Sequence, residues 1–161
     1  MHIYRTGPQT ERLEHRAIIP DDADAFFALN SHPEVMRFTG EARLESLDQA
    51  REVIVNYEDF DTVGFGRWGC ILKASGSLIG FCGLIDLRDL DAVDVGFRFL
   101  PEYWGQGLAS AASVAFGFDI LRLERIIALV LPQNVASIRV LEKCGMQADG
   151  SIIDEDNWRG S

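Results

Sequence analysis

Hydrophobic and polar residues follow two kinds of spacing in the first third of the chain, one typical of a strand and one typical of helices. Residues 12–18 alternate between apolar and polar positions, as a half-buried strand does. Residues 20–29 then place apolar side chains at helical spacing behind Pro20, a residue that favours a helix start. Ser46 can cap a further helix that is predicted to end near Tyr57. One strand followed by two helices is expected here.

The middle of the chain has the spacing of strands. Short turns containing Gly, Ser and Asp separate three such segments, and turns of this length favour antiparallel neighbours. The three predicted strands are 68–72, 78–87 and 92–100. An antiparallel meander is therefore expected.

The last third alternates between helical and strand patterns. It begins with an Ala-rich helix and continues with a branched apolar strand, a second helix and a final strand. The predicted segments are 108–121, 125–131, 134–143 and 147–153. The order of strand, helix and strand favours a β-α-β unit. We expect an α/β (α+β) fold with a mixed sheet, antiparallel at first and β-α-β later, with about six or seven strands and four helices.

Length and composition limit the chain to one compact unit. With 161 residues and 47% hydrophobic side chains, residues 1–161 are expected to form a single domain around one core. No apolar stretch is long enough to cross a bilayer, so we expect a cytoplasmic protein without a membrane partner. Three cysteines without a CxxC pair are expected in the core. No spacing of His, Cys and carboxylates predicts a metal.

The formal net charge of −10 disfavours nucleic acid as a partner, because like charges repel. A cationic or amine-bearing partner is easier to accommodate. A solvated acidic surface that keeps the protein in solution also explains the charge. Net charge alone therefore supports a function only weakly.

A glycine-rich turn follows the last strand of the predicted meander. Gly105-Gln106-Gly107 leads into the Ala-rich helix, and its small residues allow backbone N–H groups to approach an anion. The helix N-terminus also attracts an anion. A tight strand-to-helix turn would need the same small residues for packing. The turn alone leaves two alternatives, a phosphate site and a purely structural turn.

The sequence around this turn resembles a known motif. The coenzyme A motif of GNAT acetyltransferases, in the branch with Rim-type ribosomal-protein N-acetyltransferases, is similar to Gly96-Phe97-Arg98-Phe99-x-Pro101-x-Tyr103-Trp104-Gly105-x-Gly107-x-Ala109. The last helix of that family resembles Asn134-x-x-Ser137-x-x-Val140-Leu141-Glu142-Lys143-x-Gly145-Met146. The resemblance runs from about residue 10 to residue 150. It implies the GNAT acyl-CoA N-acyltransferase fold.

The resemblance implies that acetyl-CoA binds along this strand and turn. In the family the turn wraps the coenzyme A pyrophosphate, mainly through backbone N–H groups, and the strand lies beside the pantetheine arm. The implied turn contacts are Trp104, Gly105, Gln106, Gly107, Leu108, Ala109 and Ser110. Phe97 and Phe99 are the implied strand contacts, and a backbone N–H there would support the thioester carbonyl. Trp104 stands where the general family pattern has Arg or Gln.

Two residues of the last predicted helix are implied as further coenzyme contacts. Asn134 and Ser137 match family positions that reach the pantetheine and the departing sulfur, and their spacing places them on one helical face. Asn134 can instead cap the helix, with Ser137 only part of its first turn, and a cap is compatible with coenzyme contact. Ser137 is also a candidate general acid for the thiolate.

The acceptor amine must lose a proton to attack a thioester, so a base is needed. Asp94 is the best candidate, because related enzymes often have Glu at the matching position of the central strand. Alternation places Asp94 on the same face as Gly96 and Arg98. The alternative is an ordinary exposed strand carboxylate paired with Arg98.

The resemblance implies acetyl transfer from acetyl-CoA, as co-substrate, to a primary amine by direct attack in a ternary complex. The acceptor is a protein N-terminus or a small-molecule amine. The alternatives are a catalytically weak acyl-CoA-binding or partner-binding module and a plain interaction protein. The family usually adds a hairpin and a strand after the segment matching 147–153, whereas only residues 154–161 remain here. The last strand is therefore expected to be shortened or missing, with a homodimer covering the open edge.

Overall fold

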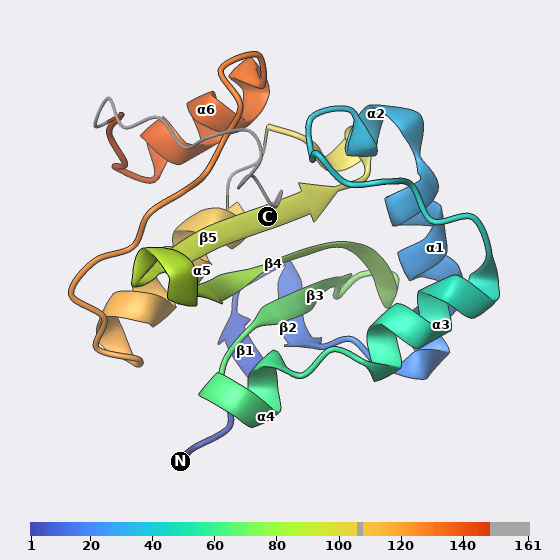
Figure 1. Cartoon of the computed structure of the whole chain (residues 1–161), viewed down its shortest axis with the longest axis horizontal. Coiled ribbons are helices and arrows are strands. Elements are labelled where there is room, and N and C mark those ends of the chain that lie inside the picture. The colour runs from blue at the N-terminus through green and yellow to red at the C-terminus, as the bar shows by residue number, and fades with distance from the viewer. Residues whose placement is uncertain (106–107, 149–161) are drawn as a thin grey trace.

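An antiparallel sheet forms the centre of the molecule (Figure 1). The computed structural model describes residues 1–105 and 108–148. The sheet in these residues has five strands in chain order, each antiparallel to the next. They are β1 (Thr6–Gln9), β2 (Leu13–Ala17), β3 (Arg67–Leu72), β4 (Ser77–Leu87) and β5 (Ala92–Phe99). The predicted meander is confirmed in β3, β4 and β5.

The helices fall into a group before the meander and a group after it. They are α1 (Ala23–Ser31), α2 (Pro33–Met36), α3 (Leu47–Val55), α4 (Asp59–Val63), α5 (Leu108–Asp119) and α6 (Val135–Lys143). Three single 3-10 turns connect elements, at Pro20–Asp22, Arg88–Leu90 and Pro101–Tyr103. The helices predicted at 20–29, 46–57, 108–121 and 134–143 are thus confirmed as α1, α3, α5 and α6.

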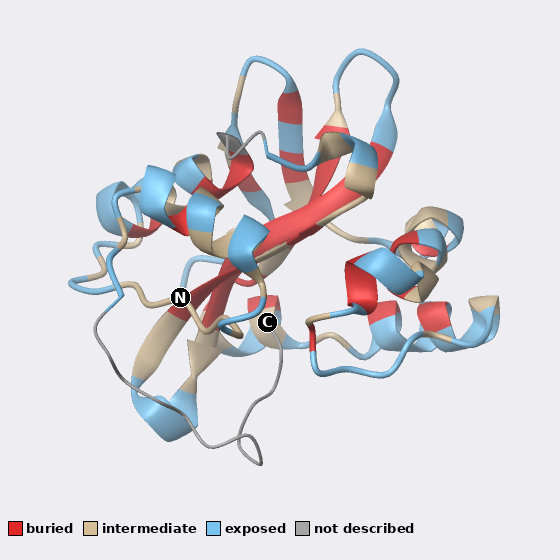
Figure 2. Cartoon of the chain, turned by 90° about the horizontal axis from the view of Figure 1, so that it is seen from above, coloured by how far each residue is buried: buried red, intermediate tan, exposed pale blue. Residues whose placement is uncertain are grey.

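Helices cover both faces of the sheet (Figure 1). α5 packs on β4, β1 and β5, whereas α1 packs on β4 from the other face and also on α3. Successive strand residues point to opposite faces, which gives each face its own core. On one face, the rings of Trp68 and of Phe116 in α5 pack edge to face with their centroids 5.1 Å apart. On the other face, Phe81 packs with Leu29 of α1. Figure 2 shows the buried residues concentrated along the strands.

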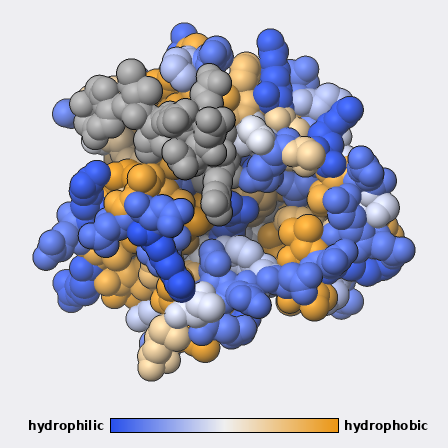
Figure 3. All heavy atoms as spheres, in the orientation of Figure 1, coloured by the Kyte–Doolittle hydropathy of each residue, from blue (hydrophilic) through white to orange (hydrophobic). Residues whose placement is uncertain are grey.

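Apolar side chains gather inside the molecule and hydrophilic ones outside. Trp68, Cys70 and Cys82 are fully buried, and burial raises the pKa of both thiols, to about 12 for Cys82. The expectation that these two cysteines are core residues is confirmed, while Cys144 is half-buried. Hydrophilic residues cover much of the face seen in Figure 3. Of the helices in the described part of the chain, none combines the length and the apolarity needed to cross a membrane.

Local signals explain where several helices begin. Oγ of Ser46 accepts the N–H of Gln49 at 3.1 Å, so the predicted cap of α3 is confirmed. Patterning did not predict β1, α2 or α4, which are only four or five residues long. Nδ1 of His32 accepts the N–H of Glu34 at 3.2 Å and thereby begins α2.

The strand predicted at 125–131 is present only as one parallel bridge, between Asp94 and Ile127. The predicted β-α-β order is kept, because this segment returns beside β5 after α5. The final strand predicted at 147–153 falls mainly outside the described residues, and residues 147 and 148 are not in a strand. Within residues 1–105 and 108–148 the sheet is therefore smaller than predicted.

An ion pair joins the end of β2 to the start of α1. Both terminal nitrogens of Arg16 donate to the carboxylate of Asp22, at 2.8 and 3.0 Å, and the Ile19 N–H donates to it at 2.9 Å. The Asp22 side chain is only 11% exposed. Burial alone raises the pKa of Asp22, but the hydrogen bonds from Arg16 and Ile19 outweigh it and leave the pKa below its ordinary value. The ionised carboxylate therefore stabilises the fold.

We predict that Asp22→Asn lowers the free energy of unfolding by about 1.5–3 kcal/mol near neutral pH, the usual worth of hydrogen bonds to a charged group. Because the folded-state pKa is the lower one, this stabilisation is present above the unfolded pKa and is lost as the pH falls through the folded pKa. Denaturant unfolding at neutral and acid pH should show a difference that shrinks in acid. Asp48→Asn is the control, because the Asp48 side chain is 94% exposed. Equal losses in the two variants would contradict the prediction.

Candidate active site

A cleft of about 760 Å³ opens between β5 and α6. Its walls come from the second half of β5, the turn after it, the start of α5, residues 128–131 and α6. α2 and the residues that follow it form the opposite end. Figure 1 shows α6 and α2 apart from each other along the β5 side of the sheet. A volume of this size is typical of a cofactor or small-molecule site.

The cleft begins where β5 and the following parallel segment separate. The Ile127 N–H donates to the Val93 carbonyl at 2.8 Å, and the Val95 N–H donates to the Ile127 carbonyl at 2.9 Å. In a regular parallel ladder the Leu129 N–H would next donate to the backbone carbonyl of Val95. It donates instead to Oδ1 of Asp94 at 2.9 Å. Asp94 therefore ends the ladder and satisfies the first N–H beyond it.

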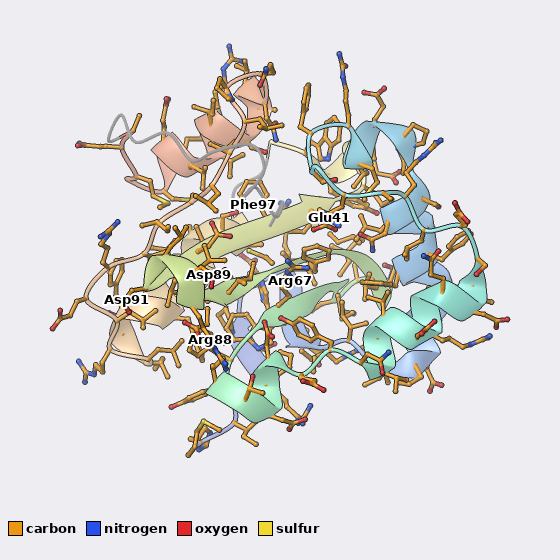
Figure 4. All side chains as sticks on the ribbon, in the orientation of Figure 1. Glu41, Arg67, Arg88, Asp89, Asp91 and Phe97 are labelled. Atoms are coloured by element: carbon orange, nitrogen blue, oxygen red, sulfur yellow. The ribbon has the colours of Figure 1, made fainter. Side chains whose placement is uncertain are left out.

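Beyond Val95 one backbone edge of β5 faces the cleft. Alternate strand residues point their N–H and C=O groups to the same edge, so the groups of Phe97 and Phe99 point the same way as those of Val95. Both phenylalanines line the cleft. The Phe99 carbonyl accepts the indole N–H of Trp104 at 2.7 Å. Phe97, which Figure 4 shows on β5, lies in the strand between Val95 and Phe99. The structure thus places both predicted strand contacts on the cleft wall.

The turn after β5 brings small residues to the cleft. Gly105 has a φ of +81°, in the left-handed region that favours glycine, and it lines the cleft together with Trp104. Ala109 and Ser110, in the first turn of α5, are buried and also line it. Of the remaining predicted contacts, two lie outside the described residues and one begins α5: Gln106, Gly107 and Leu108. The N-terminus of α5, a helix of 12 residues, favours an anion here.

α6 brings polar side chains to the opposite wall. Oδ1 of Asn134 accepts the N–H of Ser137 at 3.3 Å, so Asn134 caps the helix, and both residues line the cleft. One residue therefore serves as cap and as cleft wall. Arg139 and Lys143 line the cleft as well. They were not predicted as site residues, although their spacing of four places them together on one helical face.

Asp94 is wholly buried, with an exposed fraction of 0%. The alternative of an exposed strand carboxylate is therefore wrong. Arg98, the partner expected in that alternative, forms its ion pair with Glu41, and the Arg98 Nη2 lies 3.0 Å from the Glu41 Oε2. Val95 and Gly96 line the cleft directly beside Asp94. The role of Asp94 as a base stays a prediction.

A second polar cluster surrounds Arg98, which lines the cleft toward α2. Its Nη1 donates to Oδ1 of Asn30 at 2.8 Å. Its guanidinium lies 5.2 Å from the ring centroid of Phe81, and that of Arg67 lies 5.3 Å from the same ring. Burial lowers the pKa of Arg98, and the Glu41 carboxylate opposes this shift. Sequence patterning did not predict the cluster, because its members come from segments far apart in the chain.

In residues 1–105 and 108–148, no three His, Cys, Asp or Glu side chains gather where they could hold a metal. His15 is buried in β2 opposite Cys70, and burial lowers its pKa, which favours the neutral imidazole. Its place in β2 is that of a core residue.

Comparison with known proteins agrees with this geometry. Residues 12–147 match the family model described as an acetyltransferase (GNAT) domain. A Bacillus subtilis protein named uncharacterized N-acetyltransferase YoaA is 37% identical over 149 residues, which cover 89% of this chain and 84% of the relative. Both matches extend over most of the sheet and the cleft.

Solved structures have the same fold. A GNAT-family acetyltransferase from Bacillus anthracis superposes with a TM-score of 0.78 at 25% identity, covering 95% of this chain and 92% of its own. Spermidine N-acetyltransferase from Vibrio cholerae, solved with CoA and spermine, gives a TM-score of 0.74 at 23% identity, with coverages of 89% and 86%. The second likeness shows the fold alone. The family match and the cleft together show that the chain belongs to the GNAT acetyltransferase family and is an acyltransferase.

Proposed function

We propose that the protein moves the acetyl group of acetyl-CoA to a primary amine, which attacks the thioester directly in a ternary complex. The observation that carries this proposal is the separation of β5 from the 125–131 segment at Asp94. That separation turns one backbone edge of β5 toward a cleft large enough for a coenzyme arm. The acceptor is a protein N-terminus or a small-molecule amine.

The β5 edge would hold the reacting end of the coenzyme. Pantetheine carries amide groups, so it can lie beside Phe97 as an added strand does and exchange backbone-type hydrogen bonds. The Phe97 N–H, which points to the cleft edge, would donate to the thioester oxygen as negative charge develops there. The Phe97 N–H needs little reorganisation to act as this donor, because β5 is fixed on both sides of it. The ladder to Ile127 holds the strand before Phe97, and the Trp104 hydrogen bond holds it after Phe97.

The phosphate groups of coenzyme A lie beyond its pantetheine arm from the thiol, so they would lie together near the turn after β5. Gly105, the α5 N-terminus, Ala109 and Ser110 would form the pyrophosphate end, where backbone N–H groups and the helix dipole favour an anion. Arg139 and Lys143 on α6 add two cationic side chains. Cationic side chains of this kind form charge-assisted hydrogen bonds with phosphate oxygens.

The chemical step needs one proton to leave the amine and one to reach the sulfur. The amine nitrogen forms a bond to the carbonyl carbon, the C–S bond breaks, and coenzyme A leaves as a thiolate. We assign the base to Asp94, acting through water because the carboxylate is buried beside the cleft wall. The Ser137 hydroxyl, on the opposite wall, donates a proton to the thiolate and takes one back from water. Three other expectations stay predictions: membership of the Rim-type branch, a single domain over residues 1–161 and a homodimer.

The coenzyme site is tested by titrating acetyl-CoA into the protein by calorimetry. We predict that Arg139→Glu and Lys143→Glu each weaken binding about tenfold or more, because each brings a carboxylate toward a phosphate. Both side chains are exposed, so folding should be unaffected. Arg51→Glu on α3 makes the same charge change away from the cleft and is the control. No binding to the folded wild type would overturn the proposed function.

The base is tested with Asp94→Asn, which keeps an oxygen that can accept the Leu129 N–H. We predict that turnover falls by about 10²–10⁴, the usual contribution of a base, while the affinity for acetyl-CoA is retained. Asp94→Ala should lose both, because it also removes the acceptor that ends the ladder. Wild-type turnover in Asp94→Asn would show that another group accepts the proton.

The acid is tested with Ser137→Ala. A coenzyme A thiolate is a good leaving group, so we predict a drop in turnover of about tenfold, smaller than for a typical catalytic acid. The Asn134 cap uses the backbone N–H of Ser137, which the variant keeps. Steady-state kinetics should therefore show a lower kcat at a nearly unchanged KM for acetyl-CoA. An unchanged kcat would remove Ser137 from the mechanism.

A further inference from the structure

Arg98 presents an incompletely used carboxylate-binding edge at the cleft. Its side chain is only 5% exposed, and it lines the cleft on the side of α2. Nη1 is held by Asn30 at 2.8 Å, and Nη2 lies 3.0 Å from one oxygen of Glu41. Nε is buried and has no hydrogen-bond partner among the described residues. Buried donors are nearly always paired in folded proteins, so an unpaired one on a residue that lines a cleft points to a ligand.

The geometry of guanidinium groups identifies the ligand class. Nε and Nη2 form one edge of the fork, and a carboxylate binds that edge with both oxygens. In the present structure Glu41 reaches only Nη2. Glu41 lies in a segment without helix or strand, next to Gly40 with a φ of +73°, and its side chain is 38% exposed. It is therefore placed to move away when a second carboxylate arrives.

The charges around the acceptor end point the same way. The basic residues lining the described part of the cleft are Arg37, Arg98, Arg139 and Lys143, against Glu34 as the acidic one. After Arg139 and Lys143 are assigned to the coenzyme, Arg37, Arg98 and Glu34 remain near α2, and Glu41 adds a second carboxylate paired with Arg98. Arg67 adds a further cation beside Arg98, on the same phenylalanine ring, and Figure 4 shows Arg67 near β4 and Glu41 near the tip of β5. Glu34 and Glu41 oppose the positive charge at this end of the cleft, and displacement of Glu41 would leave that charge in excess.

We propose that the acceptor is an amine that also carries a carboxylate, and that Arg98 binds this carboxylate in place of Glu41. The inference rests on the proposed function and adds the substrate class. Val35 and Phe38, which line the same end of the cleft, suit an acceptor with an apolar side chain. An apolar α-amino acid meets both requirements. A polyamine does not, because its ammonium groups would approach Arg37 and Arg98.

The acceptor class is tested with a matched pair, phenylalanine and phenylalaninamide, with spermidine as a polyamine. Thiol release from acetyl-CoA should give a kcat/KM for phenylalanine at least about tenfold above either of the others, the loss expected for a missing charged hydrogen bond. The amide holds more neutral amine at a given pH, so this preference cannot arise from basicity. Acetylation of the amide or of spermidine in preference to phenylalanine would overturn the inference and leave the proposed function standing.

Two variants test the residues in opposite directions. Arg98→Gln, which can still bond Asn30, should lower the preference for phenylalanine over its amide by about tenfold. Glu41→Gln removes the competing charge and should lower the KM for phenylalanine several-fold, a gain that a purely structural residue would not produce. Arg88→Gln removes the same charge from a side chain that is 72% exposed and should leave the preference unchanged. If Arg98→Gln does not fold, Glu41→Gln decides, and an unchanged or higher KM there would overturn the inference.

Discussion

The end of the backbone ladder between β5 and the 125–131 segment is the constraint on which the site depends. Two backbone hydrogen bonds hold these segments parallel around Ile127, and the Asp94 side chain then takes the N–H that the next ladder bond would use. An unsatisfied buried N–H is costly, so a side-chain acceptor is what permits the two segments to separate inside the protein. The Asp94 acceptor therefore marks the point where the cleft opens, beside Val95 and Leu129.

The rest of the cleft is fixed from either side of this point. On β5, the Trp104 indole bonds the Phe99 carbonyl and holds the turn against the end of the strand. On the opposite wall, the Asn134 cap sets where α6 begins and therefore how its side chains line the cleft. Each wall is therefore held by a hydrogen bond that lies within a few residues of the side chains lining the cleft. This local anchoring explains how motifs that are far apart in the chain can form one site.

Sequence patterning predicted what depends on near neighbours. The meander was predictable because short turns join β3, β4 and β5, and the α3 and α6 caps were predictable because Ser46 and Asn134 act three residues along. β1 was missed because it is four residues long and contains Gly7 and Pro8. The extent of the 125–131 strand was overestimated, since its composition is apolar whereas its pairing depends on Asp94. Contacts between distant segments, such as that of Arg98 with Asn30, leave no periodic signal.

The buried charge of Arg98 connects folding with recognition. A guanidinium removed from water is costly unless an anion accompanies it, and Glu41 supplies one from a segment outside the regular elements. A carboxylate on the acceptor would take the place of the Glu41 carboxylate beside Arg98. The desolvation cost of the buried guanidinium would therefore stay offset by an anion when the acceptor binds. The exchange would also improve the geometry, since one oxygen of Glu41 engages Nη2 whereas a bidentate carboxylate reaches Nε as well. Discrimination would then come from the second hydrogen bond, which an amine without a carboxylate cannot make.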